Sequence, residues 1–127
     1  RDLHLSIRRQ RQMCIRDRTC TAPDYILCDE AVHDNLVSAL QKNMLEFFSE
    51  GIDAAKKDYC SIANEHHFNR LQDALKNSVS AGAKIACGGE TSQSGLYLSP
   101  AVLIDVSYEN PIMQEEIFGP ILPVVKV

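Results

Sequence analysis

The sequence predicts an α/β protein, a three-layer αβα arrangement in which a mainly parallel sheet is covered by helices. Three observations predict this class. A short apolar run is followed by two segments with helical spacing, a group of further short apolar runs comes next, and the final seven residues are almost wholly apolar. Because strands separated by helices pair most readily in parallel through crossovers, this order favours helices on the faces of a parallel sheet.

The first strand and helix are expected between residues 25 and 51. Residues 25–28 form a short apolar run after Pro23, which predicts a buried strand. Asp29 can cap a helix that ends near Gly51, and a polar connection is expected over residues 53–58. The apolar residues that recur at helical spacing are Val32, Leu36, Val37, Leu40, Met44, Phe47 and Phe48.

The second helix is expected to begin at Ser61 or Asn64 and to stop at Gly82. Its predicted apolar stripe is Phe68, Leu71, Leu75 and Val79.

Several short strands should follow that helix. They are predicted at residues 83–87, 97–98 and 102–104, with Pro100 breaking the last two apart and a polar turn or loop at residues 90–95. Residues 121–127 predict a strongly apolar strand. Because no helix or cap follows it, the domain is expected to be incomplete.

Size and composition indicate a single soluble domain or part of one. The chain has 127 residues, of which 45% are hydrophobic and 24% charged. No apolar stretch approaches the length of a membrane span, so no membrane segment is expected. Five cysteines without a CxxC pair argue against a disulfide scaffold and a zinc site. They fit a reducing compartment, so a cytoplasmic location is expected.

Charge divides the chain into two parts. Residues 1–18 contain six arginines against two aspartates, and residues 19–127 contain fifteen carboxylates against seven Lys and Arg. The arginines could indicate a nucleic-acid or targeting arm, but the aspartates argue against a transit peptide. Residues 13–18 match what one frame of a sequencing-library transposon end would encode. We therefore expect residues 1–18 to be a non-native or disordered leader, without a nucleic-acid partner.

Two segments contain candidate functional residues. Cys20 lies in a loop before the first strand, where a thiol can be partly exposed, although a lone cysteine is more often a buried apolar residue. Residues 110–120 (NPIMQEEIFGP) combine a carboxylate that could bind sugar hydroxyls with an aromatic ring that could pack on a flat ligand. The alternative for this segment is a solvated carboxylate pair and one core phenylalanine.

The remaining candidates are interpreted as structural. His66 and His67 form a polar pair at a helix start with no ligand set at metal spacing, so no metal site is expected. The cysteines expected to have no catalytic role are Cys14, Cys28, Cys60 and Cys87.

Three motifs, in matching order and spacing, closely resemble the aldehyde dehydrogenase superfamily. They are the TCTAPDY run at residues 19–25, the DYCSIANEHHFNRL run at residues 58–71, and PIMQEEIFGPILPVV at residues 111–125. The APDY form is similar to the class 3 or fatty-aldehyde branch. The resemblance covers essentially all of residues 19–127, which would be part of a catalytic domain.

The resemblance implies an enzyme that oxidises aldehydes to carboxylic acids with NAD or NADP. Cys20 matches the nucleophile that forms a thiohemiacetal and then a thioester. Glu116 matches the carboxylate that holds the nicotinamide ribose, and Phe118 matches the aromatic beside the nicotinamide ring. A small aldehyde would be the substrate, and the parent enzyme would be a homodimer, cytoplasmic or anchored to a membrane through another segment.

Departures from the family pattern leave alternatives open. Asp17 and Arg18 stand where the family has a Gly-Gln pair, and the general-base motif and the glycine-rich cofactor segment are missing. The chain alone is therefore expected to be inactive. One alternative is a non-catalytic α/β fragment or dead relative that acts as an interaction module. Another is an acylating enzyme that uses a thiol acceptor, which the APDY form disfavours.

Overall fold

The computed structural model describes residues 23–47 and 61–127. In chain order these residues form β1 (Ile26–Cys28), α2 (Glu30–Phe47), α4 (Glu65–Ser80), β2 (Lys84–Cys87), β3 (Thr91–Ser92), β4 (Tyr97–Leu98), β5 (Ala101–Ile104) and β6 (Ile121–Lys126). Two short 3-10 helices, Gln93–Gly95 and Pro111–Met113, lie in the connections. The predicted leader at residues 1–18, the connection at residues 53–58 and the helix end at Gly51 lie outside the described residues.

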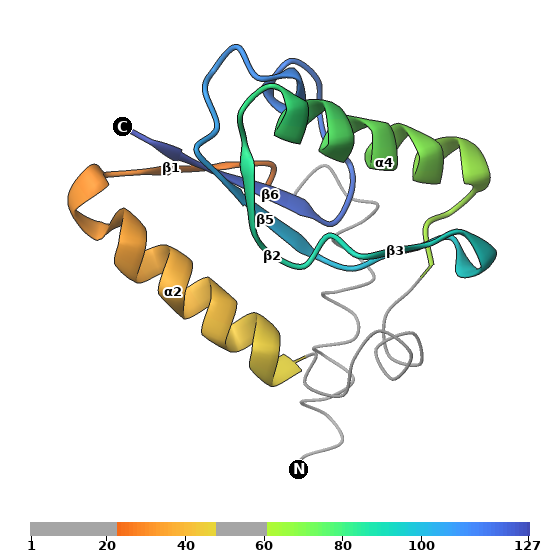
Figure 1. Cartoon of the computed structure of the whole chain (residues 1–127), viewed down its shortest axis with the longest axis horizontal. Coiled ribbons are helices and arrows are strands. Elements are labelled where there is room, and N and C mark those ends of the chain that lie inside the picture. Colours follow the sequence, from red (N-terminus) through yellow and green to blue (C-terminus); the bar gives the residue numbers. More distant parts are fainter. Residues whose placement is uncertain (1–22, 48–60) are drawn as a thin grey trace.

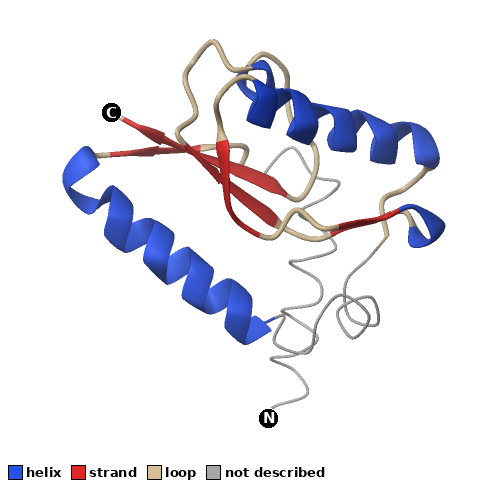
Figure 2. Cartoon of the chain, in the orientation of Figure 1, coloured by secondary structure: helices blue, strands red, loops and turns tan. Residues whose placement is uncertain are grey.

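The central sheet has the strand order β1-β6-β5-β2. Strand β6 pairs in parallel with both β1 and β5, whereas β2 pairs with β5 in the antiparallel direction. Helix α2 lies on one face of this sheet and α4 on the other, as Figures 1 and 2 show. The predicted three-layer αβα arrangement with a mainly parallel sheet is confirmed.

Each helix covers its own apolar cluster. The cluster beneath α4 is the larger and contains Phe68, Leu71, Leu75, Leu103, Ile121 and Val125, among others. The cluster beneath α2 is built on Cys28, Val102 and Val124, with Leu36 and Leu40 packed against it. Alternate residues of β5 and β6 thus point to opposite faces, as strand geometry requires.

Both helices begin at predicted caps. The carboxylate of Asp29 accepts a hydrogen bond of 2.8 Å from the N–H of Ala31 at the start of α2. The side chain of Asn64 accepts one of 2.9 Å from the N–H of His67 at the start of α4. Of the two predicted caps for the second helix, Asn64 is therefore the one used.

Four sequence predictions are wrong in detail. Val79 is 42% exposed and Ser78 is buried instead, because the side of the last turn of α4 that faces the protein is at Ser78, whose carbonyl oxygen accepts a hydrogen bond from the side chain of Asn110 over 3.1 Å. Val32 and Phe47 lie outside the buried face of α2, at 53% and 50% exposure. Strand β1 is an edge strand, so Leu27 is 52% exposed and not buried.

The fourth difference is at residues 90–95, which were expected to be a turn or loop. They contain β3, which pairs with β4, and the 3-10 helix at Gln93–Gly95.

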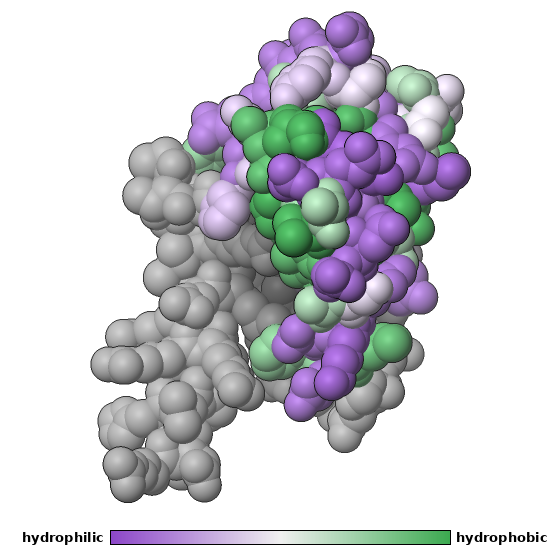
Figure 3. All heavy atoms as spheres, turned by 90° about the vertical axis from the view of Figure 1, so that its left-hand side faces the viewer, coloured by the Kyte–Doolittle hydropathy of each residue, from purple (hydrophilic) through white to green (hydrophobic). Residues whose placement is uncertain are grey.

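Apolar side chains remain exposed around β1 and α2. Figure 3 shows hydrophobic residues between hydrophilic ones on the face that carries these elements. The exposed apolar residues there include Tyr25, Leu27, Val32, Leu45 and Val127. Within the described residues, no helix is long and apolar enough to cross a bilayer.

Candidate active site

The pairing of β1 with β6 brings the two main candidate segments together. In register, Ile26 is opposite Val124, and the two strands run in the same direction. The segment that enters β1 and the loop that enters β6 therefore lie at the same end of the sheet. The first contains the APDY residues, and the second contains the EEIFGP residues.

A hydrogen bond joins these segments directly. The N–H of Ile117 donates to Oδ1 of Asp24 over 2.9 Å, although the two residues are 93 positions apart. From the opposite side, the guanidinium of Arg70 on α4 donates to the carbonyl oxygen of Ile117 over 2.7 Å. Ile117 is also 3% exposed, so its side chain is anchored in the α4 cluster. Both backbone polar groups of this residue are thus held by charged side chains from other elements.

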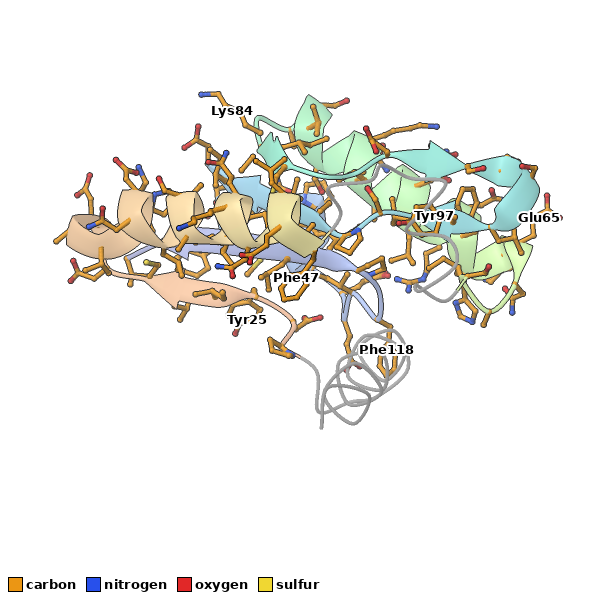
Figure 4. The ribbon with its side chains drawn as sticks, turned by 90° about the horizontal axis from the view of Figure 1, so that it is seen from below. Tyr25, Phe47, Glu65, Lys84, Tyr97 and Phe118 are labelled. Atoms are coloured by element: carbon orange, nitrogen blue, oxygen red, sulfur yellow. The ribbon has the colours of Figure 1, made fainter. Side chains whose placement is uncertain are left out.

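Glu116 and Phe118 stand on either side of the anchored Ile117, and both are exposed. Phe118 is 41% exposed and its φ is 46°, a left-handed conformation that is uncommon for an aromatic residue. Figure 4 shows its ring projecting outward from the loop. The loop therefore presents a carboxylate and an aromatic ring to solvent while the residue between them is fixed.

The end of the loop is packed tightly against the core. A Cβ at Gly119 would overlap the side chain of Leu71 on α4, so no larger residue fits without a shift. Pro120 is buried, and its carbonyl oxygen accepts a hydrogen bond of 2.8 Å from the N–H of Ala101 at the start of β5. The backbone of the loop is therefore fixed to α4 and to the sheet.

Cys20, the predicted nucleophile, lies outside the described residues, as do Cys14 and Cys60. Of the other two cysteines, Cys28 is buried, and its thiol donates to the carbonyl oxygen of Asp29 over 3.5 Å. Cys87 is half-buried, and burial raises the pKa of its thiol. Cys28 is therefore inaccessible to a substrate, and the raised pKa of Cys87 disfavours a thiolate nucleophile there.

The histidine pair lies at the start of α4 and is exposed, with ring centroids 5.7 Å apart. Among the residues that the structure describes, no group of three or more His, Cys, Asp or Glu residues could hold a metal ion.

Sequence reasoning did not assign a role to Asp24 or Arg70. Both occur inside the motifs that resemble the family, Asp24 just after the cysteine and Arg70 in the second run. The single sequence gives no sign that either side chain reaches residue 117. Their roles depend on the pairing of β1 with β6 and on the docking of α4, which only the folded chain brings about.

The chain is similar in sequence and in fold to known aldehyde dehydrogenases. A sequence model described as "Aldehyde dehydrogenase family" matches residues 8–127. The rat protein "Aldehyde dehydrogenase, dimeric NADP-preferring" is 42% identical over 110 residues, which cover 87% of this chain and 23% of that protein. Mouse "Aldehyde dehydrogenase family 3 member A2" is 46% identical over 110 residues, which cover 87% of this chain and 22% of that protein.

The structure gives the same result. The substrate-bound state of Staphylococcus aureus AldH superposes on 93% of this chain and 26% of its own, with a TM-score of 0.79 and 36% identity. The chain spans less than a quarter of the length of the rat and mouse relatives, at 23% and 22%. The resemblance drawn from the three motifs, including the class 3 or fatty-aldehyde branch, is confirmed. The chain belongs to the aldehyde dehydrogenase family.

Proposed function

We propose that this chain is a segment of an NAD(P)-dependent aldehyde dehydrogenase that oxidises aliphatic or aromatic aldehydes to carboxylic acids. The observation that carries the proposal is the hydrogen bond between Asp24 and Ile117. It joins the segment that follows the proposed nucleophile to the loop that carries the proposed cofactor residues. This contact supports the proposal, because the nucleophile and the cofactor ring must meet around one substrate carbon.

Cys20 is the proposed nucleophile. It precedes Asp24 by four residues, so chain length alone keeps their Cα atoms within about 14 Å. Its thiolate would attack the aldehyde carbon to form a thiohemiacetal, whose oxygen would take a hydrogen bond from the backbone N–H of Cys20. After loss of hydride, water would cleave the resulting thioester to the carboxylic acid and restore the thiol.

The residues of the EEIFGP loop fit a nicotinamide nucleotide. The carboxylate of Glu116 is exposed and can accept hydrogen bonds from the two hydroxyls of a ribose. The exposed ring of Phe118 can pack against a flat heterocycle. When bound, NAD or NADP would accept the hydride that leaves the substrate carbon. The contribution of this chain is to hold the ribose and the ring in a fixed orientation.

Residues 1–127 are proposed to be inactive by themselves. Their sequence contains neither the general-base motif nor the glycine-rich cofactor segment of the family. A positioned base contributes about 10²–10⁴-fold to such reactions, so hydrolysis of the thioester would be slow without it. The whole enzyme is proposed to be cytoplasmic and to form a homodimer. Size-exclusion chromatography with light scattering would test the dimer.

The deciding experiment uses the full-length enzyme that contains this segment. With an aldehyde and NAD or NADP, formation of reduced nicotinamide should be observed, and C20A should reduce it to background. C87A is the matched control, because Cys87 is half-buried with a raised thiol pKa and should be dispensable. Mass spectrometry after quenching should find the acyl group on Cys20. An unsubstituted enzyme that forms no reduced nicotinamide with any aldehyde would overturn the proposal.

The acylating reaction and the interaction module are tested by the same preparation. Production of an acyl-thiol when coenzyme A is added would favour the acylating reaction. A folded full-length protein that binds neither NAD nor NADP would favour the interaction module, for which the exposed apolar residues Tyr25 and Leu27 on the β1 edge are the supporting observation.

A further inference from the structure

Ile117 lies between the two proposed cofactor residues, Glu116 and Phe118, and three contacts hold it in place. Its N–H donates to Asp24, its carbonyl accepts from Arg70, and its side chain is buried at 3% exposure. Glu116 and Phe118 on either side are exposed. The orientation of the peptide at residue 117 therefore sets the directions in which both neighbouring side chains leave the backbone.

Asp24 and Arg70 connect the loop around Ile117 to different parts of the chain. Arg70 ties the loop to α4, which lies in the same half of the chain as the loop. Asp24 ties the loop to the segment that immediately precedes β1 and follows the TCTA residues. The pairing of β1 with β6 aligns the two strands, and the carboxylate of Asp24 then fixes the loop beyond the strand ends.

The chemistry of this bond suits a positioning role. A carboxylate that accepts from a backbone N–H makes a charge-assisted hydrogen bond, which is shorter and stronger than a neutral one. Ile117 is buried, so without Asp24 its N–H would lose its acceptor in a site with little access to water. The loop would relieve this by turning the peptide, and Glu116 and Phe118 would move with it.

We propose that Asp24 is a positioning residue that fixes the orientation of the cofactor loop against the segment that enters β1. This inference rests on the proposed function, because it assigns Asp24 a role in the same site. Hydride transfer requires the substrate carbon, held on the nucleophile, to lie close to the nicotinamide ring. A displacement of about 1 Å in such an arrangement can reduce the rate by about 10²-fold.

The first test uses the chain itself and needs no activity. Hydrogen exchange followed by amide NMR should find the Ile117 amide at least about tenfold less protected in D24A than in the unsubstituted chain. D24N retains a side-chain oxygen at the same position and should restore part of the protection. D73A removes an exposed carboxylate from α4 and should change nothing at Ile117. Equal protection of Ile117 in D24A and D73A would overturn the inference.

The second test uses the full-length enzyme and separates positioning from a general loss of structure. D24A should lower kcat by about 10- to 100-fold and raise the KM for NAD(P), with the KM for aldehyde little changed. D24N should recover part of kcat. A purely structural role would instead lower the amount of active enzyme and leave the KM for NAD(P) unchanged, which active-site titration would detect.

The two tests also distinguish the two proposals. If the unsubstituted enzyme oxidises aldehydes and D24A has an unchanged kcat, the role of Asp24 is overturned and the proposed function stands. If the unsubstituted enzyme has no dehydrogenase activity, the proposed function fails and the positioning role fails with it, and the exchange of Ile117 then reports only a structural contact.

Discussion

The side chain of Leu71 occupies the space in which residue 119 would place a Cβ, so the glycine at that position lets the loop rest directly on α4. Leu71 is 1% exposed and belongs to the cluster between α4 and the sheet. Gly119 follows Phe118 and therefore ends the segment that carries the proposed cofactor residues. The close approach means that the packing of α4 and the position of the loop depend on each other.

Substitution of Gly119 by alanine should destabilise the chain by about 1–3 kcal/mol, because the added methyl group has to displace Leu71 or the loop backbone. Urea denaturation measures the change. The matched control is G95A, where an added Cβ would be 3.9 Å from its nearest neighbour and little change is expected. Additive effects in the double variant G119A/L71A would contradict the proposed clash, since the two substitutions should compensate in part.

Substitution of Arg70 by methionine should release the carbonyl of Ile117 while keeping most of the aliphatic stem of the side chain. The lost bond joins a charged donor to a part-buried acceptor, so we expect a loss of about 1.5–3 kcal/mol in the free energy of unfolding. Faster exchange should be confined to the loop before β6. K76M, an exposed position on the same helix, serves as the control. Similar effects from both substitutions would indicate that the contact of Arg70 contributes nothing specific.

Phe68 is the aromatic residue at the centre of the α4 cluster, and it is 0% exposed. F68A should cost about 3–5 kcal/mol, because the truncation loses apolar burial and leaves a cavity. L45A, at a residue that is 71% exposed on α2, should stay within about 0.5 kcal/mol of the unsubstituted chain. Thermal and urea unfolding should rank the two variants in this order. A small effect of F68A would mean that α4 is not docked as described.

The ion pair between Lys84 and Asp105 predicts a measurable pH effect. Their charged atoms lie 2.8 Å apart, and the hydrogen bond from Lys84 lowers the pKa of the Asp105 carboxyl below its usual range. A lowered pKa in the folded state means that the pair stabilises the fold above the unfolded pKa. This contribution is lost as the pH falls through the lower, folded value.

In K84M, the pKa of Asp105 should therefore rise toward its usual value, and carbon NMR titration of the carboxyl would measure it. The shift should shrink at high salt, because both groups are solvent-accessible and salt screens them. K42M, on α2, is the control. An unchanged Asp105 titration in K84M would rule out the ion pair in solution.

Local signals in the sequence predicted the helices and their starts. Asp29 and Asn64 are residues that cap helices, and both accept the expected backbone hydrogen bonds. The ends of the apolar stripes were less predictable. Val79 and Phe47 keep helical spacing but remain exposed, whereas Ser78, beside Val79 in the last turn of α4, is buried.

The sequence did not predict the exposure of a strand where that exposure depends on the neighbouring strands in the sheet. An apolar run such as residues 25–28 has the same composition in a central strand and in an edge strand, and only the strand order places β1 at the edge. The candidate site shows the same limit. Glu116 and Phe118 are predicted from their motif and remain a proposal, whereas the contacts of Asp24 and Arg70 depend on segments that meet only after folding.

Strand β6 lies between β1 and β5 in the sheet, although it follows both of them in the sequence. On the ribosome, β1 and α2 are therefore synthesised long before the strand that pairs with β1 leaves the exit tunnel. Contacts between such distant segments slow folding, because closing the long intervening loop costs conformational entropy before the contacts can compensate for it. Until β6 emerges, the apolar residues of β1 have no partner strand and can associate with other exposed apolar surfaces. Chaperone binding during translation would therefore be most useful at this stage.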